Sequence, residues 1–228
     1  MSHATSSSLT REPRVFLIAL ASRLAWLNVA LHALALTLTL AFVRPAAPFV
    51  PLADRLAHLS TSATSFRLAW AVWMLCALAL VAFFAAVSEL LAGAWLARLA
   101  LSLATAGAAV DLLCDLTQAV VLTELAAGGA APQALFLAME RLASAGGIVV
   151  ANGLYSLAVL ALGHAAASAT GSAMPRLLGL LTFLSGMALA GAGLGESELL
   201  LSTSTGATML GYALWVLSVA RALARSAQ

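Results

Sequence analysis

Apolar residues in this sequence gather in long runs, separated by short segments that are polar or contain glycine and proline. A helix needs about 20 predominantly apolar residues to cross the hydrocarbon core of a bilayer. The runs are rich in Leu and Ala and do not alternate with polar residues, which is typical of helices and not of barrel strands. The pattern therefore predicts an all-α, polytopic bundle of six transmembrane helices. The six runs are Leu24–Val43, Leu68–Ser88, Leu99–Thr123, Leu142–Leu162, Leu177–Leu194 and Leu199–Ala220.

The segments between the runs predict the connections. Residues 44–65 form the longest segment and contain three prolines, so we expect a loop there with a short interfacial helix around Leu52–Leu59. The segment "HAAASATGSAMPR" predicts a flexible loop, and the remaining segments predict tight turns. Residues 1–14 are polar and are expected to form a disordered tail. A single six-helix transmembrane domain is then expected over residues 15–225.

Composition supports an integral membrane protein whose surroundings are the lipid bilayer. The chain is 63% hydrophobic and only 9% charged, whereas a soluble domain carries about 25% charged residues. The net charge of +2 and the lack of a long basic cluster argue against a nucleic-acid partner. The sequence has no lysine, which excludes Schiff-base chemistry. Cys76 and Cys114 lack neighbours at metal-binding spacing, so neither a metal nor a cofactor is predicted.

The distribution of arginine predicts the orientation. With six spans, both termini lie on the same side of the membrane, and cytoplasmic loops of membrane proteins carry an excess of Lys and Arg. We therefore expect a bacterial cytoplasmic membrane protein with its N- and C-termini in the cytoplasm. Seven arginines would lie on the side of the termini and four on the other: Arg11, Arg14, Arg23, Arg98, Arg176, Arg221 and Arg225, against Arg44, Arg55, Arg67 and Arg141.

Two carboxylic acids, Asp111 and Asp115, lie one helical turn apart inside the third apolar run. A charged side chain at mid-bilayer costs at least about 2.5–3.5 kcal/mol on insertion scales, so such residues usually have a function and a partner. At helical spacing both acids share one face with Gln118, and the opposite face is Leu, Ala and Val. This pattern predicts a helix with one face toward lipid and the other toward a polar interior.

Two other predicted helices also carry polar stripes, and we expect the stripes to converge on a polar cavity. Such a cavity would bind a small solute, or exchange a proton, in transport or sensing. Two neighbouring carboxylates repel each other, which makes one a candidate for proton exchange, and a histidine can join such a relay. The alternative is that the stripes only hydrogen-bond between helices, in a structural or assembly subunit. The candidate cavity residues are Asp111, Asp115, Gln118, Arg141, Asn152, His32 and Asn28.

The short segment "AAGGAA" makes the third and fourth helices antiparallel neighbours. Counted from this turn, Asp115 and Arg141 lie at similar depths of roughly 13–15 Å. We therefore expect Asp115 to pair with Arg141 and Asp111, one turn deeper, to remain a free acid. Glu140 points about 100° away from Arg141 around the helix, and we expect it at the membrane interface.

Two short motifs resemble a bacterial family of six-helix membrane proteins that is catalogued only as a domain of unknown function. The motifs are Phe66-Arg67-Leu68 and Pro175-Arg176, and the order and lengths of the six helices agree as well. Family members often carry aspartates in the second helix, whereas here they lie in the third. The resemblance implies the architecture and no specific activity. Pro175-Arg176 opens a Leu/Gly-rich helix whose small residues predict close helix packing: Gly179, Gly186, Ala190 and Gly193.

An enzymatic alternative comes from "ARLALSLATAGAAVDLLCD", which fits Ala-Arg-x8-Gly-x3-Asp-x3-Asp. This looks like the second half of the CDP-alcohol phosphotransferase motif, in which Asp111 and Asp115 would bind a divalent metal. The first half of that motif needs two further aspartates and a glycine, but Leu90, Gly93 and Ala94 occupy those places. A lipid-metabolising enzyme is therefore kept as an alternative, and the sequence favours a non-enzymatic role.

Overall fold

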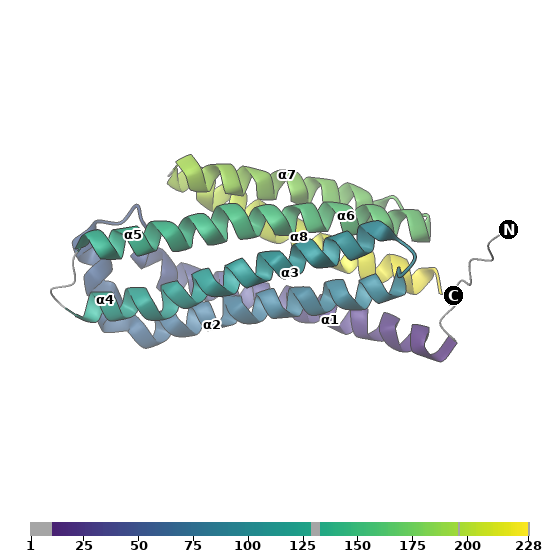
Figure 1. The fold of residues 1–228 in the computed structure, drawn as a ribbon, viewed down its shortest axis with the longest axis horizontal. Helices are drawn as coiled ribbons and strands as arrows, with labels where there is room; N and C mark the ends of the chain where they lie inside the picture. The colour runs from purple at the N-terminus through teal and green to yellow at the C-terminus, as the bar shows by residue number, and fades with distance from the viewer. Residues whose placement is uncertain (1–10, 129–132, 196, 228) are drawn as a thin grey trace.

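A computed structural model shows the chain as a bundle of long helices (Figure 1). The structure describes residues 11–128, 133–195 and 197–227, and within these ranges it contains no strand. Six helical segments are long and apolar enough to cross a membrane. The predicted fold class, an all-α bundle of six membrane-spanning helices, is therefore confirmed.

Several spans are composed of more than one helical segment. Three π-helical segments occur: η1 (Thr39–Val43) continues α1, η3 (Thr117–Leu122) joins α3 to α4, and η4 (Ala145–Ala151) joins α5 to α6. A short 3-10 turn, η2 (Arg44–Ala46), follows η1. The α-helices are α1 (Arg11–Leu38), α2 (Leu52–Leu90), α3 (Trp95–Leu116), α4 (Thr123–Ala127), α5 (Gln133–Ser144), α6 (Asn152–Thr170), α7 (Met174–Gly195) and α8 (Glu198–Arg225).

The helices extend further than the apolar runs predict. Residues 60–65, expected as loop, belong to α2, which is kinked at Ser62 (φ −117°, ψ 20°). Thr61 donates its hydroxyl hydrogen to the Ala57 carbonyl in this stretch, as Ser and Thr side chains in helices commonly do. Residues 11–14 of the expected tail are helical, and residues 1–10 lie outside the described part. The expected flexible loop after α6 is a short turn, because Gly171 ends the helix in the left-handed conformation (φ 70°).

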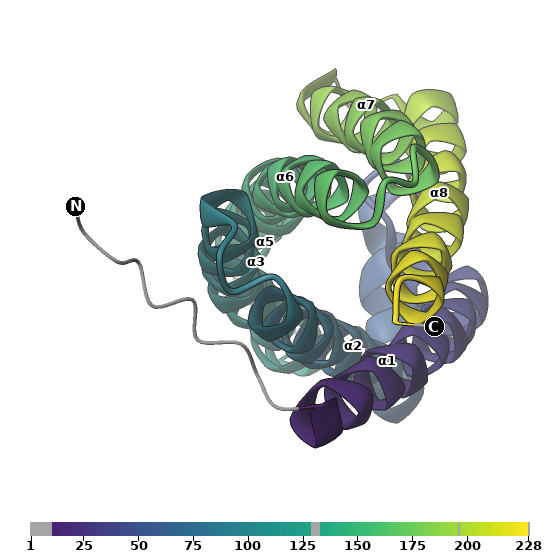
Figure 2. The same cartoon turned by 90° about the vertical axis from the view of Figure 1, so that its right-hand side faces the viewer.

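The six spans form a ring in which consecutive spans pack side by side and α1 closes the ring against α8 (Figure 2). The start of α1, the end of α8, the α2–α3 turn and the α6–α7 turn lie together, at what we call the terminal end (Figure 1). The opposite end, with α4, α5 and the start of α2, is the hairpin end. Figure 2 looks along the ring from the terminal end, and α1 and α8 diverge away from the viewer.

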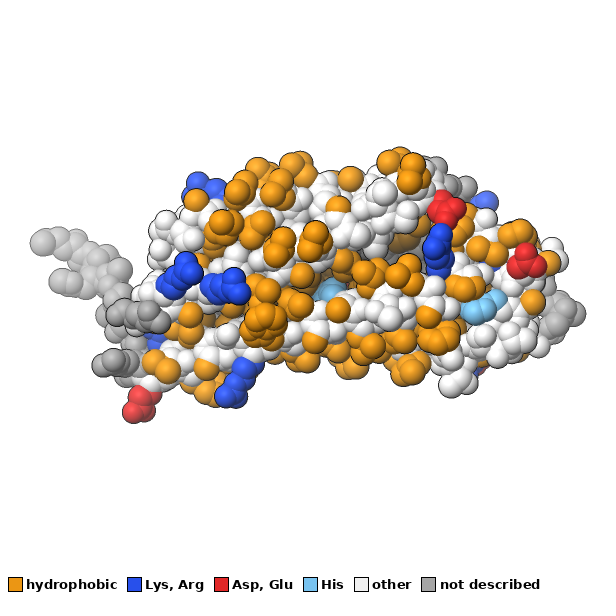
Figure 3. Space-filling view, turned by 180° about the vertical axis from the view of Figure 1, so that it is seen from behind, with side chains coloured by type: hydrophobic (Ala, Val, Ile, Leu, Met, Phe, Trp, Pro, Cys, Tyr) orange, Lys and Arg blue, Asp and Glu red, His pale blue; other side chains and the backbone are white. Residues whose placement is uncertain are grey.

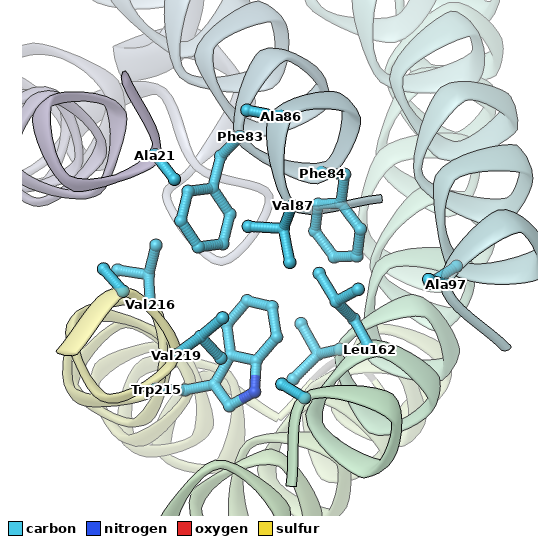
Figure 4. Packing of buried hydrophobic residues seen from close by; sticks show 14 of the residues in the cluster. Ala21, Phe83, Phe84, Ala86, Val87, Ala97, Leu162, Trp215, Val216 and Val219 are labelled. Atoms are coloured by element: carbon cyan, nitrogen blue, oxygen red, sulfur yellow. The ribbon is translucent and has the colours of Figure 1, made fainter. Parts of the chain in front are cut away.

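The main hydrophobic core fills the terminal half of the ring. Trp215 of α8 is fully buried and packs with Phe83, Phe84 and Leu162 from α2 and α6 (Figure 4). The close approach of α6 and α7 to this indole depends on Gly163 and Gly179, because a Cβ at either position would lie 3.0 or 3.2 Å from Trp215 Nε1. The terminal core therefore combines one large side chain with glycines that make room for it.

A second, smaller core lies at the hairpin end. Its buried members come from η2, α2, η3 and α5, so this core joins segments from three of the spans and the α1–α2 connection. A third, small cluster of Ala35, Val72 and Cys76 joins α1 to α2. The buried residues of the hairpin core are Ala46, Leu59, Phe66, Leu122 and Phe136.

The length of α7 indicates which part of the ring the hydrocarbon core surrounds. From Arg176 to Gly195 this helix rises roughly 28 Å, close to the thickness of about 30 Å of a bilayer core. Large apolar side chains point outward from this region, as the orange surface of Figure 3 illustrates. Near the end of α7, Gly193 lies against Ile148 of η4. Helix α5 precedes η4 in the chain and continues away from this level, so it projects beyond the layer at the hairpin end.

We expect Trp215→Ala to lower the free energy of unfolding by about 3–5 kcal/mol, because a buried Trp is replaced by a void. The measurement is the thermal midpoint of the detergent-purified protein. The matched control is Trp26→Ala, since Trp26 is 57% exposed on the outer face of α1. Similar losses in the two variants would contradict the placement of the core.

Candidate functional site

A cavity of about 530 Å³ lies between the two hydrophobic cores. All six spans contribute to its wall, which is mostly apolar. Its floor includes Leu80, Val159 and Tyr212, which are also members of the terminal core. On the face shown in Figure 3 the surface is visibly hollowed between rows of apolar side chains. The cavity is of the size that holds a small ligand.

Asp111 and Asp115 both face this cavity. Asp111 accepts a hydrogen bond from the Tyr155 hydroxyl at 3.2 Å. Asp115 is 3% exposed, and its Oδ2 has no hydrogen-bond partner among the described residues. Among the described residues, no cationic side chain lies within ion-pair distance of either carboxylate.

Glycines hold the wall close to these acids. A Cβ at Gly146 in η4 would collide with Cys114 Sγ, and one at Gly147 would lie 3.7 Å from Asp111 Oδ1. A Cβ at Gly107 would lie 3.0 Å from Tyr155 Cε1. The small residues therefore allow η4 and α6 to approach α3, and this approach positions the Tyr155 hydroxyl on Asp111.

The three π-helical segments border the cavity, and a polar side chain hydrogen-bonds to each. Trp73 Nε1 donates to Thr39 Oγ1 at 2.8 Å, and Arg67 Nε donates to the Ala119 carbonyl at 3.2 Å. Asn152 Nδ2 donates to the Gly147 carbonyl at 3.0 Å. Wide turns of this kind often occur at functional sites, and here each is held by a side-chain hydrogen bond.

His32 reaches the cavity from α1. Its Nδ1 lies 2.8 Å from the Asn28 carbonyl oxygen, and its ring packs 4.8 Å from the Tyr212 ring, centroid to centroid. Asn28 lies behind the cavity wall and is fully buried. Its Nδ2 donates to the Ala79 carbonyl, and its Oδ1 accepts from the Tyr212 hydroxyl. Asn28 therefore joins α1, α2 and α8 and does not line the cavity.

The predicted pair between Asp115 and Arg141 is wrong. Arg141 is exposed, does not line the cavity and makes no ion pair with a described residue. The physical reason is η4, because the wider turn of a π-helix shifts the angular phase between α5 and α6. Regular helical spacing would place Arg141 and Asn152 on the same face, but η4 lies between them, so they do not share a face. Gln118 and Asn152 do line the cavity with the aspartates and His32.

Glu140, not Arg141, points inward, which corrects its expected place at the interface. Glu140 is 5% exposed and accepts a hydrogen bond from the guanidinium of Arg55, which is 4% exposed. The Phe136 ring centroid lies 5.8 Å from Arg55 Cζ. This buried ion pair closes the cavity at the hairpin end, where Glu140 forms part of the wall. A second pair, Arg44 with Glu198 at 3.2 Å, is exposed at the rim.

The polar stripes in the sequence did not predict the aromatic residues of the cavity wall. Phe66, Trp70 and Trp73 of α2 line the cavity together with Tyr212 of α8. The signal was present in "SFRLAWAVW", where the three aromatic residues follow helical spacing. Aromatic stripes, however, occur equally in ordinary cores, so the spacing alone does not identify a cavity.

The described ranges contain no group of three or more His, Cys, Asp or Glu side chains that could hold a metal ion. The comparisons with protein-family models, curated proteins and solved structures give no match. The resemblance to the six-helix family therefore stays a prediction from its two motifs.

The two ion pairs should differ greatly in their contribution to stability. We expect Glu140→Ala to lower the free energy of unfolding by about 3–5 kcal/mol, because it leaves the Arg55 charge buried and unpaired. Glu198→Ala, which breaks the exposed pair, should cost about 0–1 kcal/mol. Thermal midpoints in detergent measure both. Equal and small losses would show that Arg55 and Glu140 are not a buried pair.

Proposed function

We propose that this protein binds a small solute in the cavity between its helices and thereby transports or senses it, with proton exchange at Asp111 or Asp115. The observation that carries the proposal is a ligand-sized cavity that reaches two aspartates, neither of which forms an ion pair with a described residue. An interior filled by side chains would instead favour a purely structural subunit.

Unpartnered polar atoms on the cavity wall support this proposal. Asp115 Oδ2, Trp70 Nε1 and Thr208 Oγ1 are buried, have no partner among the described residues and belong to cavity-lining side chains. Buried polar groups in proteins almost always have hydrogen-bond partners. The contents of the cavity, water or solute, are therefore the natural source of partners for these three atoms.

We further propose the bacterial cytoplasmic membrane as the location, on the family resemblance, with both termini in the cytoplasm. The arginine distribution supports this orientation, since exposed Arg23, Arg98, Arg176 and Arg221 surround the terminal end. Under this proposal the cavity lies on the outer side of the terminal core, in the leaflet that faces away from the cytoplasm.

A thermal-shift screen of small cationic, anionic and neutral solutes tests the function. We expect at least one solute to raise the thermal midpoint of the wild type. At a solute concentration of 100 times Kd, binding should increase the free energy of unfolding by about 2.7 kcal/mol. Asp111→Asn and Asp115→Asn should lose this response, and Asp115→Asn should not itself lower stability, because its Oδ2 has no hydrogen bond to lose. Proteoliposomes with an imposed pH gradient then test whether the same solute moves protons.

The control is Asp54→Asn, since Asp54 is an exposed acid in the first turn of α2, outside the cavity. It should respond to the solute as the wild type does. If no solute stabilises the wild type, or if all three aspartate variants respond alike, the proposed function is wrong.

Cysteine labelling in whole cells tests the orientation. In a variant without Cys76 and Cys114, we expect Asp54→Cys to react with a membrane-impermeant maleimide, because the hairpin end faces outward. Ser226→Cys, at the exposed end of α8, should react only after lysis. The opposite labelling pattern would reverse the proposed topology.

A further inference from the structure

We infer that the ligand of this cavity is a hydrophobic organic cation, such as a quaternary ammonium or phosphonium with an apolar body, which enters from the bilayer between α1 and α8. This inference rests on the proposed function and names its ligand class and route. It follows from the charge of the wall, its aromatic lining and the position of its opening.

Acidic side chains outnumber basic ones on the cavity wall. Glu140 is paired with Arg55, and Glu198 is paired with Arg44. Asp111 and Asp115 have no cationic partner among the described residues, and His32, the other base on the wall besides Arg44, contacts the Asn28 carbonyl. Asp115 is buried, and its Oδ2 has no hydrogen-bond partner among the described residues. A cation in the cavity would provide this carboxylate with a partner. An anion at this place would be repelled.

Aromatic rings surround the same space. Trp70, Trp73, Tyr155 and Tyr212 line the cavity from α2, α6 and α8, together with Phe66. Aromatic faces attract organic cations by about 2 kcal/mol or more where water is excluded, and such rings are the usual recognition elements for quaternary ammonium groups. A bare metal ion would not use the apolar part of the wall, whereas an organic cation with an apolar body would fill it.

The opening lies where α1 and α8 separate. Toward the terminal end the two helices are joined by the bond from the Tyr212 hydroxyl to Asn28 Oδ1. From there to the exposed Arg44–Glu198 pair, no hydrogen bond between described residues joins α1 or η1 to α8. Leu40, 58% exposed on η1, and exposed Ser202 and Gly206 on α8 line both the cavity and this gap.

This gap faces lipid and not bulk water along most of its length. Glu198 follows the end of α7 by a few residues, so the gap lies within the layer that α7 spans, on the hairpin side. An amphiphilic cation dissolved in that leaflet places its charge near the headgroups, close to the level of Asp115. Entry from the bilayer therefore needs no passage through either hydrophobic core.

Matched probes of opposite or no charge test the ligand class by equilibrium binding to the detergent-purified protein. Tetraphenylphosphonium and benzyltrimethylammonium should bind, and tetraphenylborate and neopentylbenzene, their anionic and neutral counterparts, should bind at least tenfold more weakly. Asp115→Asn should weaken binding of the cations at least tenfold and leave the anion unaffected or improved. Asp54→Asn should bind as the wild type does.

The route is tested by association rates of tetraphenylphosphonium with the protein in lipid nanodiscs. A Cβ at Gly206 meets no atom within 4 Å, so Gly206→Trp should obstruct the gap without disturbing the fold. We expect it to slow association at least fivefold with an unchanged thermal midpoint. Gly191→Trp is the control, because Gly191 is equally unobstructed and does not line the cavity.

The outcomes separate this inference from the proposed function. If the solute screen finds an aspartate-dependent neutral or anionic solute and neither cation binds, the ligand class is wrong and the proposed function stands. If no solute of any charge binds, both are wrong. Equal association rates in the two tryptophan variants would overturn entry between α1 and α8.

Discussion

Within a bilayer, water cannot satisfy polar groups, so each must find its partner inside the protein. Most of this bundle follows from that requirement. Asn28 satisfies itself by joining three spans, and Ser156 and Thr182 donate to carbonyls of their own helices. Arg55 and Glu140 form a buried ion pair in the hairpin half. Five buried side-chain atoms have no partner among the described residues; three of them belong to the cavity wall, and the other two are Arg55 Nε and Trp215 Nε1.

Small residues decide where the ring is dense and where it is hollow. Lipid-facing surfaces give helices no hydrophobic reason to associate, so close packing and hydrogen bonds hold them together. At the terminal end, Gly163 and Gly179 bring α6 and α7 onto Trp215 and exclude any space. Toward the hairpin end, Gly146 and Gly147 bring η4 onto α3 beside the cavity. Close approach through glycine therefore occurs both in the solid terminal core and in the wall of the cavity.

The sequence predicts the number and order of the spans, because bilayer thickness requires long apolar runs. The face of α3 with Asp111 and Asp115 could be predicted too, since that helix is regular up to Leu116, and Gln118 in the first turn of η3 still lines the same cavity. The helix ends, and the lack of an ionic partner for Asp115 among the described residues, could not be predicted. The helix ends are missed because helix-forming residues extend beyond the apolar runs. The inward position of Glu140 is missed because the π-helical turns change which residues share a face, whereas the prediction assumes regular turns.

The terminal core also limits what the cavity can do. Behind Tyr212, Trp215 of α8 packs against Phe83 and Phe84 of α2, and Leu162 of α6 completes this contact between three spans (Figure 4). Passage to the far side would require these rings to separate, and a ligand can shift a conformational equilibrium only by the difference in its affinity for the two states. Whether these aromatic rings separate thus distinguishes two modes of action. If they stay packed, the protein can only bind solutes that reach the cavity from one leaflet. If they separate, it can also carry a solute across the membrane.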